Sequence, residues 1–125
     1  YRFRDAKLER LTEDHSYVEE LVRMGKIEAR DAEEHPAANV VLKAVGIDDK
    51  LCLDFDYFEM QDDDIYIICS DGLYKDLEET KITTIIESNS EDMTELSQAL
   101  LTASLDAGGT DNTSIITLKM RQKVN

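Results

Sequence analysis

The alternation of apolar and polar residues predicts a β-hairpin first and further strands along the chain. Residues 1–12 alternate around the turn-like stretch DAK, which is typical of a hairpin. Residues 51–57 alternate most regularly, so they predict a strand with one buried face. The apolar runs at residues 40–45 and 65–69 predict two more strands, the latter covered on both faces because no position in it is polar. Residues 113–120 predict the last strand.

Apolar residues at three- and four-residue spacing predict helices between these strands. Residues 12–32 contain one such stretch, and residues 28–34 a second, shorter helical turn. A short helix is expected around residues 77–86. A longer helix is expected to begin at Ser90 as its N-cap and to stop at Gly108. The pattern therefore predicts an α+β fold with most of its helices in the second half.

The net charge of the chain excludes some classes of binding partner. The 125 residues are the size of one domain, and 28 acidic against 14 basic residues give a formal net charge of −14. Such a chain does not suit nucleic acid or an anionic membrane surface, because both need Lys and Arg. No apolar run has the length of a membrane span, and no signal peptide is visible. We therefore expect a cytoplasmic protein that binds neither nucleic acid nor membrane.

Two aspartates stand where strands end or begin. Asp71 follows the apolar run 65–69, and Asp111 precedes the strand predicted at 113–120. If these strands are antiparallel neighbours, both carboxylates lie at one edge of the sheet. Such a pair persists when a cation lies between the carboxylates or when one of them holds a proton. Gly72 is expected to allow a sharp turn after Asp71.

The same residues have a second interpretation as ordinary turns. Asp-Gly is a common turn pair, and the stretch GGTDN at residues 108–112 is common in loops. A hard divalent ion such as Mg²⁺ or Mn²⁺ takes oxygen ligands, but two carboxylates are too few for two ions. Spacing alone therefore leaves both a metal site and a pair of turns open.

Four motifs in order carry a resemblance to a known family. They are LTEDHS at 11–16, the stretch from Gly-Lys-Ile to Val-Gly at 25–46, DDDIYIICSDGL at 62–73 and GGTDNTSIITL at 108–118. Read together, they resemble the metal-dependent protein phosphatases of type 2C, the PPM family. Asp63 stands where that family usually has a turn glycine, a position that Asp tolerates. The whole chain, residues 1–125, is similar to the C-terminal half of one such domain, with its N-terminal half missing.

This resemblance implies a fold and a site. The fold would be part of a four-layer α/β/β/α sandwich with mainly antiparallel sheets, and residues 16–39 would be the flap beside the active site. Asp71 and Asp111 would be metal ligands, supported by Gly72 and by Asn112, which would orient Asp111. The cofactors would be two Mg²⁺ or Mn²⁺ ions in the intact domain. No other catalytic residue of the family matches a position in this chain.

The resemblance also implies an activity. The intact protein would hydrolyse phosphoserine and phosphothreonine in proteins through a water activated by two metal ions. Its partners would be phosphorylated protein substrates, with an opposing serine/threonine kinase. The family's early acidic ligand and phosphate-binding arginine have no counterpart here, so we expect the 125-residue chain alone to be inactive. The alternatives are a non-catalytic phosphatase-like binding domain and a self-associating domain.

Overall fold

The computed structural model describes most of the chain, namely residues 1–32, 34–38, 40–44, 46, 49 and 53–122. The chain forms two compact units. The sheet unit consists of Tyr1–Leu11 together with Glu59–Asn125, and the middle unit consists of Thr12–Phe58.

The sheet unit is built on four antiparallel strands. They are β1 (Arg2–Arg4), β2 (Lys7–Glu9), β3 (Ile65–Cys69) and β4 (Ile115–Lys119), in the order β2-β1-β3-β4. The hairpin predicted at residues 1–12 is confirmed. Its two turn residues, Asp5 and Ala6, both have positive φ angles, as a two-residue hairpin turn with the right twist requires. The strands predicted around 65–69 and 113–120 are also confirmed.

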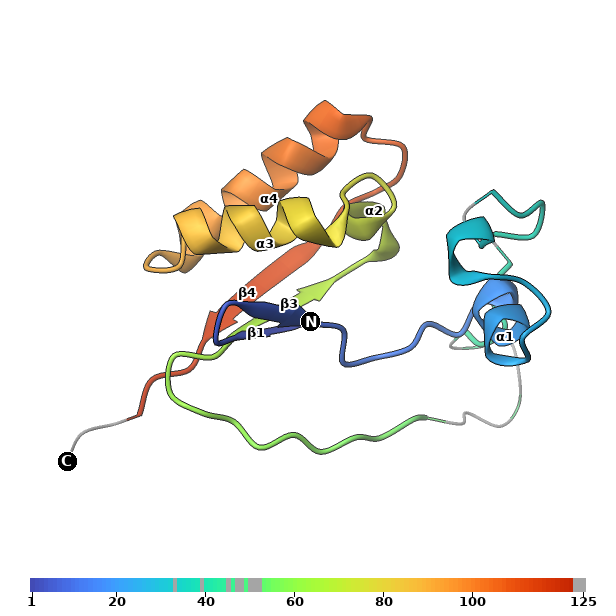
Figure 1. Cartoon of the computed structure of the whole chain (residues 1–125), viewed down its shortest axis with the longest axis horizontal. Helices are drawn as coiled ribbons and strands as arrows, with labels where there is room; N and C mark the ends of the chain where they lie inside the picture. The colour runs from blue at the N-terminus through green and yellow to red at the C-terminus, as the bar shows by residue number, and fades with distance from the viewer. Residues whose placement is uncertain (33, 39, 45, 47–48, 50–52, 123–125) are drawn as a thin grey trace. The chain divides into compact units, whose positions relative to one another are not determined.

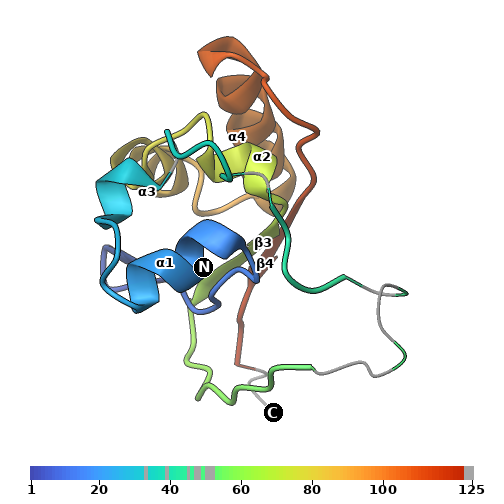
Figure 2. The same ribbon diagram turned by 90° about the vertical axis from the view of Figure 1, so that its right-hand side faces the viewer.

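Helices cover one face of this sheet. Both views place α3 (Glu79–Ser88) and α4 (Met93–Ala107) on the same side of β3 and β4, while the short α2 (Asp71–Tyr74) follows β3 directly (Figures 1 and 2). The buried residues of the core between the layers are aliphatic, and they are Ile65, Ile67, Leu73, Leu77, Ile82, Ile86, Leu96 and Leu100. The arrangement of an antiparallel sheet with helices confirms the α+β fold class.

The long helix α4 begins later than predicted. Asp92, not Ser90, is its N-cap, because the Asp92 carboxylate accepts hydrogen bonds from the backbone N–H groups of Thr94 and Glu95 at 2.7 and 3.1 Å. The predicted stop is confirmed, since Gly108 follows the last helical residue as the C-cap.

The middle unit contains α1 (Tyr17–Arg23) and the 3-10 turn η1 (Ala29–Asp31), which confirms helical structure in residues 12–32. The hydroxyl of Ser16 caps α1 by accepting a hydrogen bond from the N–H of Glu19 at 3.3 Å. An isolated β-bridge joins Ser16 to Val41.

Two predicted strands are wrong as far as the structure describes them. Residues 40–44 contribute only the single bridge at Val41, and residues 53–57 form no strand, with Phe55 78% and Tyr57 91% exposed. Residues 45, 51 and 52 of these predictions lie outside the described residues. The physical reason is that a strand needs a hydrogen-bonded neighbour, and no described strand pairs with either segment.

The strand at 65–69 also differs from its prediction in one respect. Ile65 and Ile67 are buried under the helices, but Ile68 is 59% exposed on the opposite face. The unbroken apolar run therefore has only one face covered within the described chain.

Candidate metal centre

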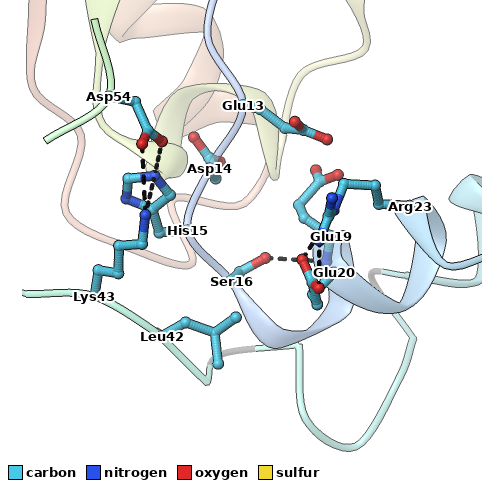
Figure 3. Close-up of a pocket in the computed structure, with 10 residues that line it drawn as sticks. All are labelled: Glu13, Asp14, His15, Ser16, Glu19, Glu20, Arg23, Leu42, Lys43 and Asp54. Carbon is cyan, nitrogen blue, oxygen red and sulfur yellow. Dashed lines mark hydrogen bonds and ion pairs between the residues drawn. The ribbon is translucent and has the colours of Figure 1, made fainter. Parts of the chain in front are cut away.

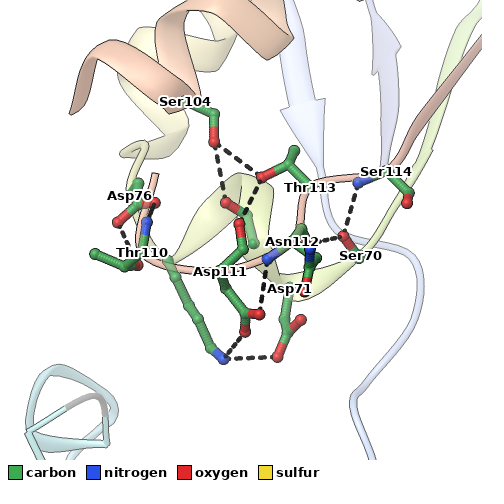
Figure 4. A network of polar contacts seen from close by, with 11 residues as sticks. Ser70, Asp71, Asp76, Ser104, Thr110, Asp111, Asn112, Thr113 and Ser114 are labelled. Carbon is green, nitrogen blue, oxygen red and sulfur yellow. Dashed lines mark hydrogen bonds and ion pairs between the residues drawn. The ribbon is translucent and has the colours of Figure 1, made fainter. Parts of the chain in front are cut away.

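The structure brings Asp71 and Asp111 together at one edge of the sheet. β3 and β4 are antiparallel with Cys69 opposite Ile115, so the residues that follow β3 and precede β4 are neighbours. Asp71 is the first residue of α2 rather than the last of the strand, and Asp111 lies in the loop before β4 (Figure 4). The juxtaposition expected from the sequence is confirmed, whereas a role in metal binding stays a prediction.

A lysine ammonium group lies between the two carboxylates. The Nζ atom of Lys75 is 2.8 Å from Oδ2 of Asp71 and 3.0 Å from Oδ2 of Asp111. The side chains of the two aspartates are nearly half exposed, and that of Lys75 is 28% exposed. Oxygen atoms from the two aspartates therefore already converge on one positive charge.

The contacts of Lys75 shift the pKa of Asp111 and of its own ammonium group. Its hydrogen bond holds the pKa of Asp111 below the ordinary value, and the backbone N–H of Asn112 acts in the same direction. Lys75 donates hydrogen bonds to Asp71 and to Asp111, and both raise the pKa of its ammonium group, with the larger contribution from Asp71. At neutral pH Asp111 is therefore ionised and Lys75 is protonated.

The loop that carries Asp111 is fastened to the end of β3. The hydroxyl of Ser70 donates to the carbonyl of Asn112 and accepts from the N–H of Ser114, both at 2.9 Å. The backbone N–H of Asn112 donates to Oδ1 of Asp111 at 2.8 Å. Asn112 therefore orients Asp111 through its main chain, a contact that does not depend on the asparagine side chain.

Gly72 is required by this close approach. A Cβ atom added there would lie 2.5 Å from the carbonyl oxygen of Asn112, which is shorter than any real contact of that kind. Gly72 is not among the glycines with positive φ, so the sharp turn expected from the sequence is not its reason. The glycine instead lets the loop before β4 lie directly against α2.

Three polar residues that the sequence did not single out complete the cluster. Asp76 accepts from the N–H and the hydroxyl of Thr110 at 2.9 and 2.8 Å, and the fully buried Ser104 donates to the carbonyl of Gly72 at 3.1 Å (Figure 4). The third is Lys75, which follows Asp71 by four residues and so shares its helical face, a signal visible in the sequence. Asp76 and Ser104 gave no signal because their partners are over 30 residues away.

The oxygen atoms of this cluster suit a hard divalent cation in kind but not in number. Carboxylate oxygens are the ligands that Mg²⁺ and Mn²⁺ prefer, and the Lys75 ammonium marks the place where two of them share a cation. The described residues contain no group of three or more His, Cys, Asp or Glu side chains placed to hold a metal ion. The cluster therefore offers two carboxylates, which is fewer than a divalent ion needs to complete its coordination shell.

The middle unit has a polar cleft of its own. It has a volume of about 270 Å³ and is lined by Glu13, Asp14, His15, Ser16, Glu19, Glu20, Arg23, Leu42, Lys43 and Asp54 (Figure 3). His15 pairs with the carboxylate of Asp54, and the hydrogen bond holds the pKa of Asp54 below its ordinary value. Lys43 also pairs with Asp54, at 3.5 Å, and Arg23 pairs with Glu20 at 2.5 Å. The basic side chains of the cleft, those of His15, Arg23 and Lys43, are therefore all paired with carboxylates of the same unit.

Comparison with known proteins shows which proteins the chain is similar to in sequence and fold. The homologues of the chain are serine/threonine phosphatases of the PPM family, and the chain corresponds to about half of each, consistent with the C-terminal half of a type 2C domain. No protein-family model matches the chain. No helix in the described part is long and apolar enough to cross a membrane.

One curated relative and one solved structure show the extent of the similarity. The serine/threonine phosphatase stp of Listeria welshimeri is 35% identical over 116 residues, which are 93% of this chain and 46% of that protein. The chain thus spans about half the length of the curated relatives it matches. The crystal structure of the PPM Ser-Thr phosphatase MsPP from Mycobacterium smegmatis is 35% identical, covers 96% of this chain and 51% of its own, and superposes with a TM-score of 0.85.

A third relative was solved with metal. The catalytic domain of the phosphatase PstP in complex with two manganese ions is 25% identical, covers 98% of this chain and 49% of its own, and has a TM-score of 0.80.

Proposed function

We propose that the protein carrying this chain hydrolyses phosphoserine and phosphothreonine in proteins with the help of two divalent metal ions. The observation that supports this most is the convergence of Asp71 and Asp111 on one cation position. It occurs in a chain whose homologues are serine/threonine phosphatases, one of them solved with two manganese ions.

In this proposal Asp71 and Asp111 hold Mg²⁺ or Mn²⁺ together with ligands from outside the described residues. The bound ions supply Lewis-acid activation of a water and neutralise charge on the transferred phosphoryl group. The residues of this chain place the carboxylates. Asp71 is fixed at the start of α2, and Asp111 is oriented by the N–H of Asn112, while the hydroxyl of Ser70 fastens the loop.

The partners follow from the same proposal. The substrates are phosphorylated proteins, and an opposing serine/threonine kinase supplies them. We place the reaction in the cytoplasm, where protein kinases act on soluble substrates. Residues 16–39 of the middle unit are proposed to act as a flap that influences the choice of substrate.

The test is hydrolysis of a phosphothreonine peptide by the whole protein with Mn²⁺, compared with its Asp111→Asn variant. Asparagine keeps the shape of the side chain and removes its charge, so we expect activity to fall by about a hundredfold or more. The exposed Asp106 of α4 provides the control, because Asp106→Asn removes the same charge without changing the contacts among Asp71, Lys75 and Asp111. Equal activity of the Asp111→Asn and Asp106→Asn proteins would contradict the proposal.

The 125-residue chain by itself is expected to show no useful turnover of p-nitrophenyl phosphate with Mn²⁺. Two carboxylates do not fill the coordination of two ions, and the described residues provide no third such ligand at the cluster. Turnover comparable to that of a complete phosphatase, lost on Asp71→Ala, would show that this chain is sufficient for catalysis.

A further inference from the structure

Lys75 is a cation of the chain itself placed where the proposed metal ion would bind. Its Nζ atom contacts one carboxylate oxygen of each aspartate, at 2.8 and 3.0 Å. These oxygens belong to residues 40 positions apart in the sequence, yet one ammonium group satisfies both. Without a cation between them, two carboxylates this close would repel each other.

We propose that Lys75 is a built-in competitor for the metal position, an internal counter-ion that keeps Asp71 and Asp111 together when no divalent ion is bound and must move aside when one binds. The inference rests on the proposed function, since it concerns the same two carboxylates. It assigns to Lys75 control over the divalent-ion concentration at which the site fills.

The geometry of Lys75 suits this role. It is the C-cap of α2, one helical turn after Asp71, and its backbone N–H is bonded to the carbonyl of Asp71 at 3.0 Å, so its main chain is fixed. Its ammonium group sits on four flexible methylene groups and is partly exposed, so it can move into solvent without unfolding the helix. A lysine is therefore a displaceable occupant, unlike a buried structural cation.

Such competition weakens the apparent affinity of the site for a divalent ion by a measurable amount. An ion binds only the fraction of molecules in which Lys75 has left the carboxylates, and the apparent dissociation constant rises by the inverse of that fraction. The ammonium group contacts both carboxylates at once, so we expect the open fraction to be small. Removing the ammonium group should therefore tighten Mn²⁺ binding by about tenfold or more.

The experiment measures Mn²⁺ binding to the whole protein through the EPR signal of free Mn²⁺, which requires no activity. Lys75→Met removes the charge and retains most of the length, and Lys75→Arg keeps a cation at the position. Lys81→Met makes the same change of net charge at an exposed position of α3. We expect tighter binding in Lys75→Met alone, and we expect Asp111→Asn in the Lys75→Met background to abolish the gain.

The outcomes separate this inference from the proposed function. If binding to the wild-type protein depends on Asp111 but Lys75→Met binds no more tightly than Lys81→Met, the competitor role is wrong and the metal site stands. Weaker binding in Lys75→Met would overturn the inference differently, by showing that Lys75 is a structural latch that the metal site needs. If no variant, Lys75→Met included, shows binding that depends on Asp111, the metal site fails and the inference fails with it.

Discussion

At the scale of single residues, one carbonyl oxygen explains why position 72 is glycine. The Asn112 carbonyl oxygen lies 2.5 Å from the place of a Cβ atom at position 72, and it accepts a hydrogen bond from the hydroxyl of Ser70. Backbone, not a flexible side chain, blocks the space, so the loop before β4 can make room only by moving. A change at Gly72 therefore acts on the placement of Asp111.

Gly72→Ala is expected to lower the free energy of unfolding by about 1–3 kcal/mol, the usual cost of overpacking. It should also weaken any binding of Mn²⁺ that depends on Asp111, because the loop is pushed away from α2. Urea unfolding measures the first effect and Mn²⁺ titration the second. Stability and Mn²⁺ affinity equal to those of the wild type would show that the loop does not lie against Gly72 in solution.

A second residue-scale feature is the buried carboxylate of Asp64 at the start of β3. It is 1% exposed and accepts two hydrogen bonds from the Arg4 guanidinium at 2.6 Å, one from the N–H of Gln61 and one from the hydroxyl of Tyr66. Arg4 is the main cause that holds the pKa of Asp64 well below its usual range, although burial alone would raise it. The ion pair ties β1 to β3.

Asp64→Asn should therefore destabilise the chain in a pH-dependent way. The depressed pKa means that ionised Asp64 stabilises the fold fully above its unfolded-state pKa of about 4, and that this contribution is lost as pH falls below it. We expect a cost of about 2–3 kcal/mol at pH 7, typical of lost hydrogen bonds to a charged group.

Urea unfolding of wild type and Asp64→Asn at pH 7 and at pH 3 tests this prediction, with the exposed Asp106→Asn as the control. The difference between wild type and Asp64→Asn should shrink at the lower pH. A difference that stays constant between the two pH values would mean that Asp64 does not act through its charge.

At the scale of secondary-structure elements, the β3–β4 pair leaves an apolar face without a cover among the described residues. Ile68 and Ile116 are directly paired across the strands and are 59% and 55% exposed, and Leu118 beside them is 42% exposed. β4 is also an edge of the four-stranded sheet. Exposed apolar faces and open strand edges both favour association with another chain.

The isolated chain is therefore expected to self-associate through this face. Sedimentation should show an average mass that rises with concentration for the wild type and stays monomeric for Ile68→Thr/Ile116→Thr. Leu105→Thr is the control, because Leu105 is as exposed but lies on α4. A wild-type chain that is monomeric at every concentration would contradict the prediction.

The strands that the sequence predicted correctly are those that have a partner strand within the chain. The strands at 65–69 and 113–120 pair with each other, so each pattern had a partner within the chain. Residues 53–57 alternate just as clearly, yet their aromatic residues are exposed. Alternation reports which face a segment could bury, but a strand forms only where another strand supplies hydrogen bonds. The periodicity of a segment does not show whether a partner strand is present.

At the scale of the whole molecule, the sequence located the acidic pair but not what surrounds it. Asp71 and Asp111 could be found because the ends of antiparallel neighbours meet, and Asp63 could replace a turn glycine because aspartate tolerates its φ of 63°. Ser104 and Asp76 could not be found, since each bonds to a residue more than 30 positions away, Gly72 in α2 for Ser104 and Thr110 for Asp76. Only the packing of α4, α2 and the loop before β4 against one another reveals their contacts.

The central claim is that Asp71 and Asp111 together bind a divalent ion at the edge of the sheet. The most direct measurement is anomalous X-ray scattering from crystals of the whole protein grown with Mn²⁺. We predict a manganese peak bonded to carboxylate oxygens of both aspartates, with the Lys75 ammonium moved away from them. Manganese bound elsewhere, or no peak at saturating Mn²⁺ with Lys75 still bridging the two carboxylates, would contradict the account.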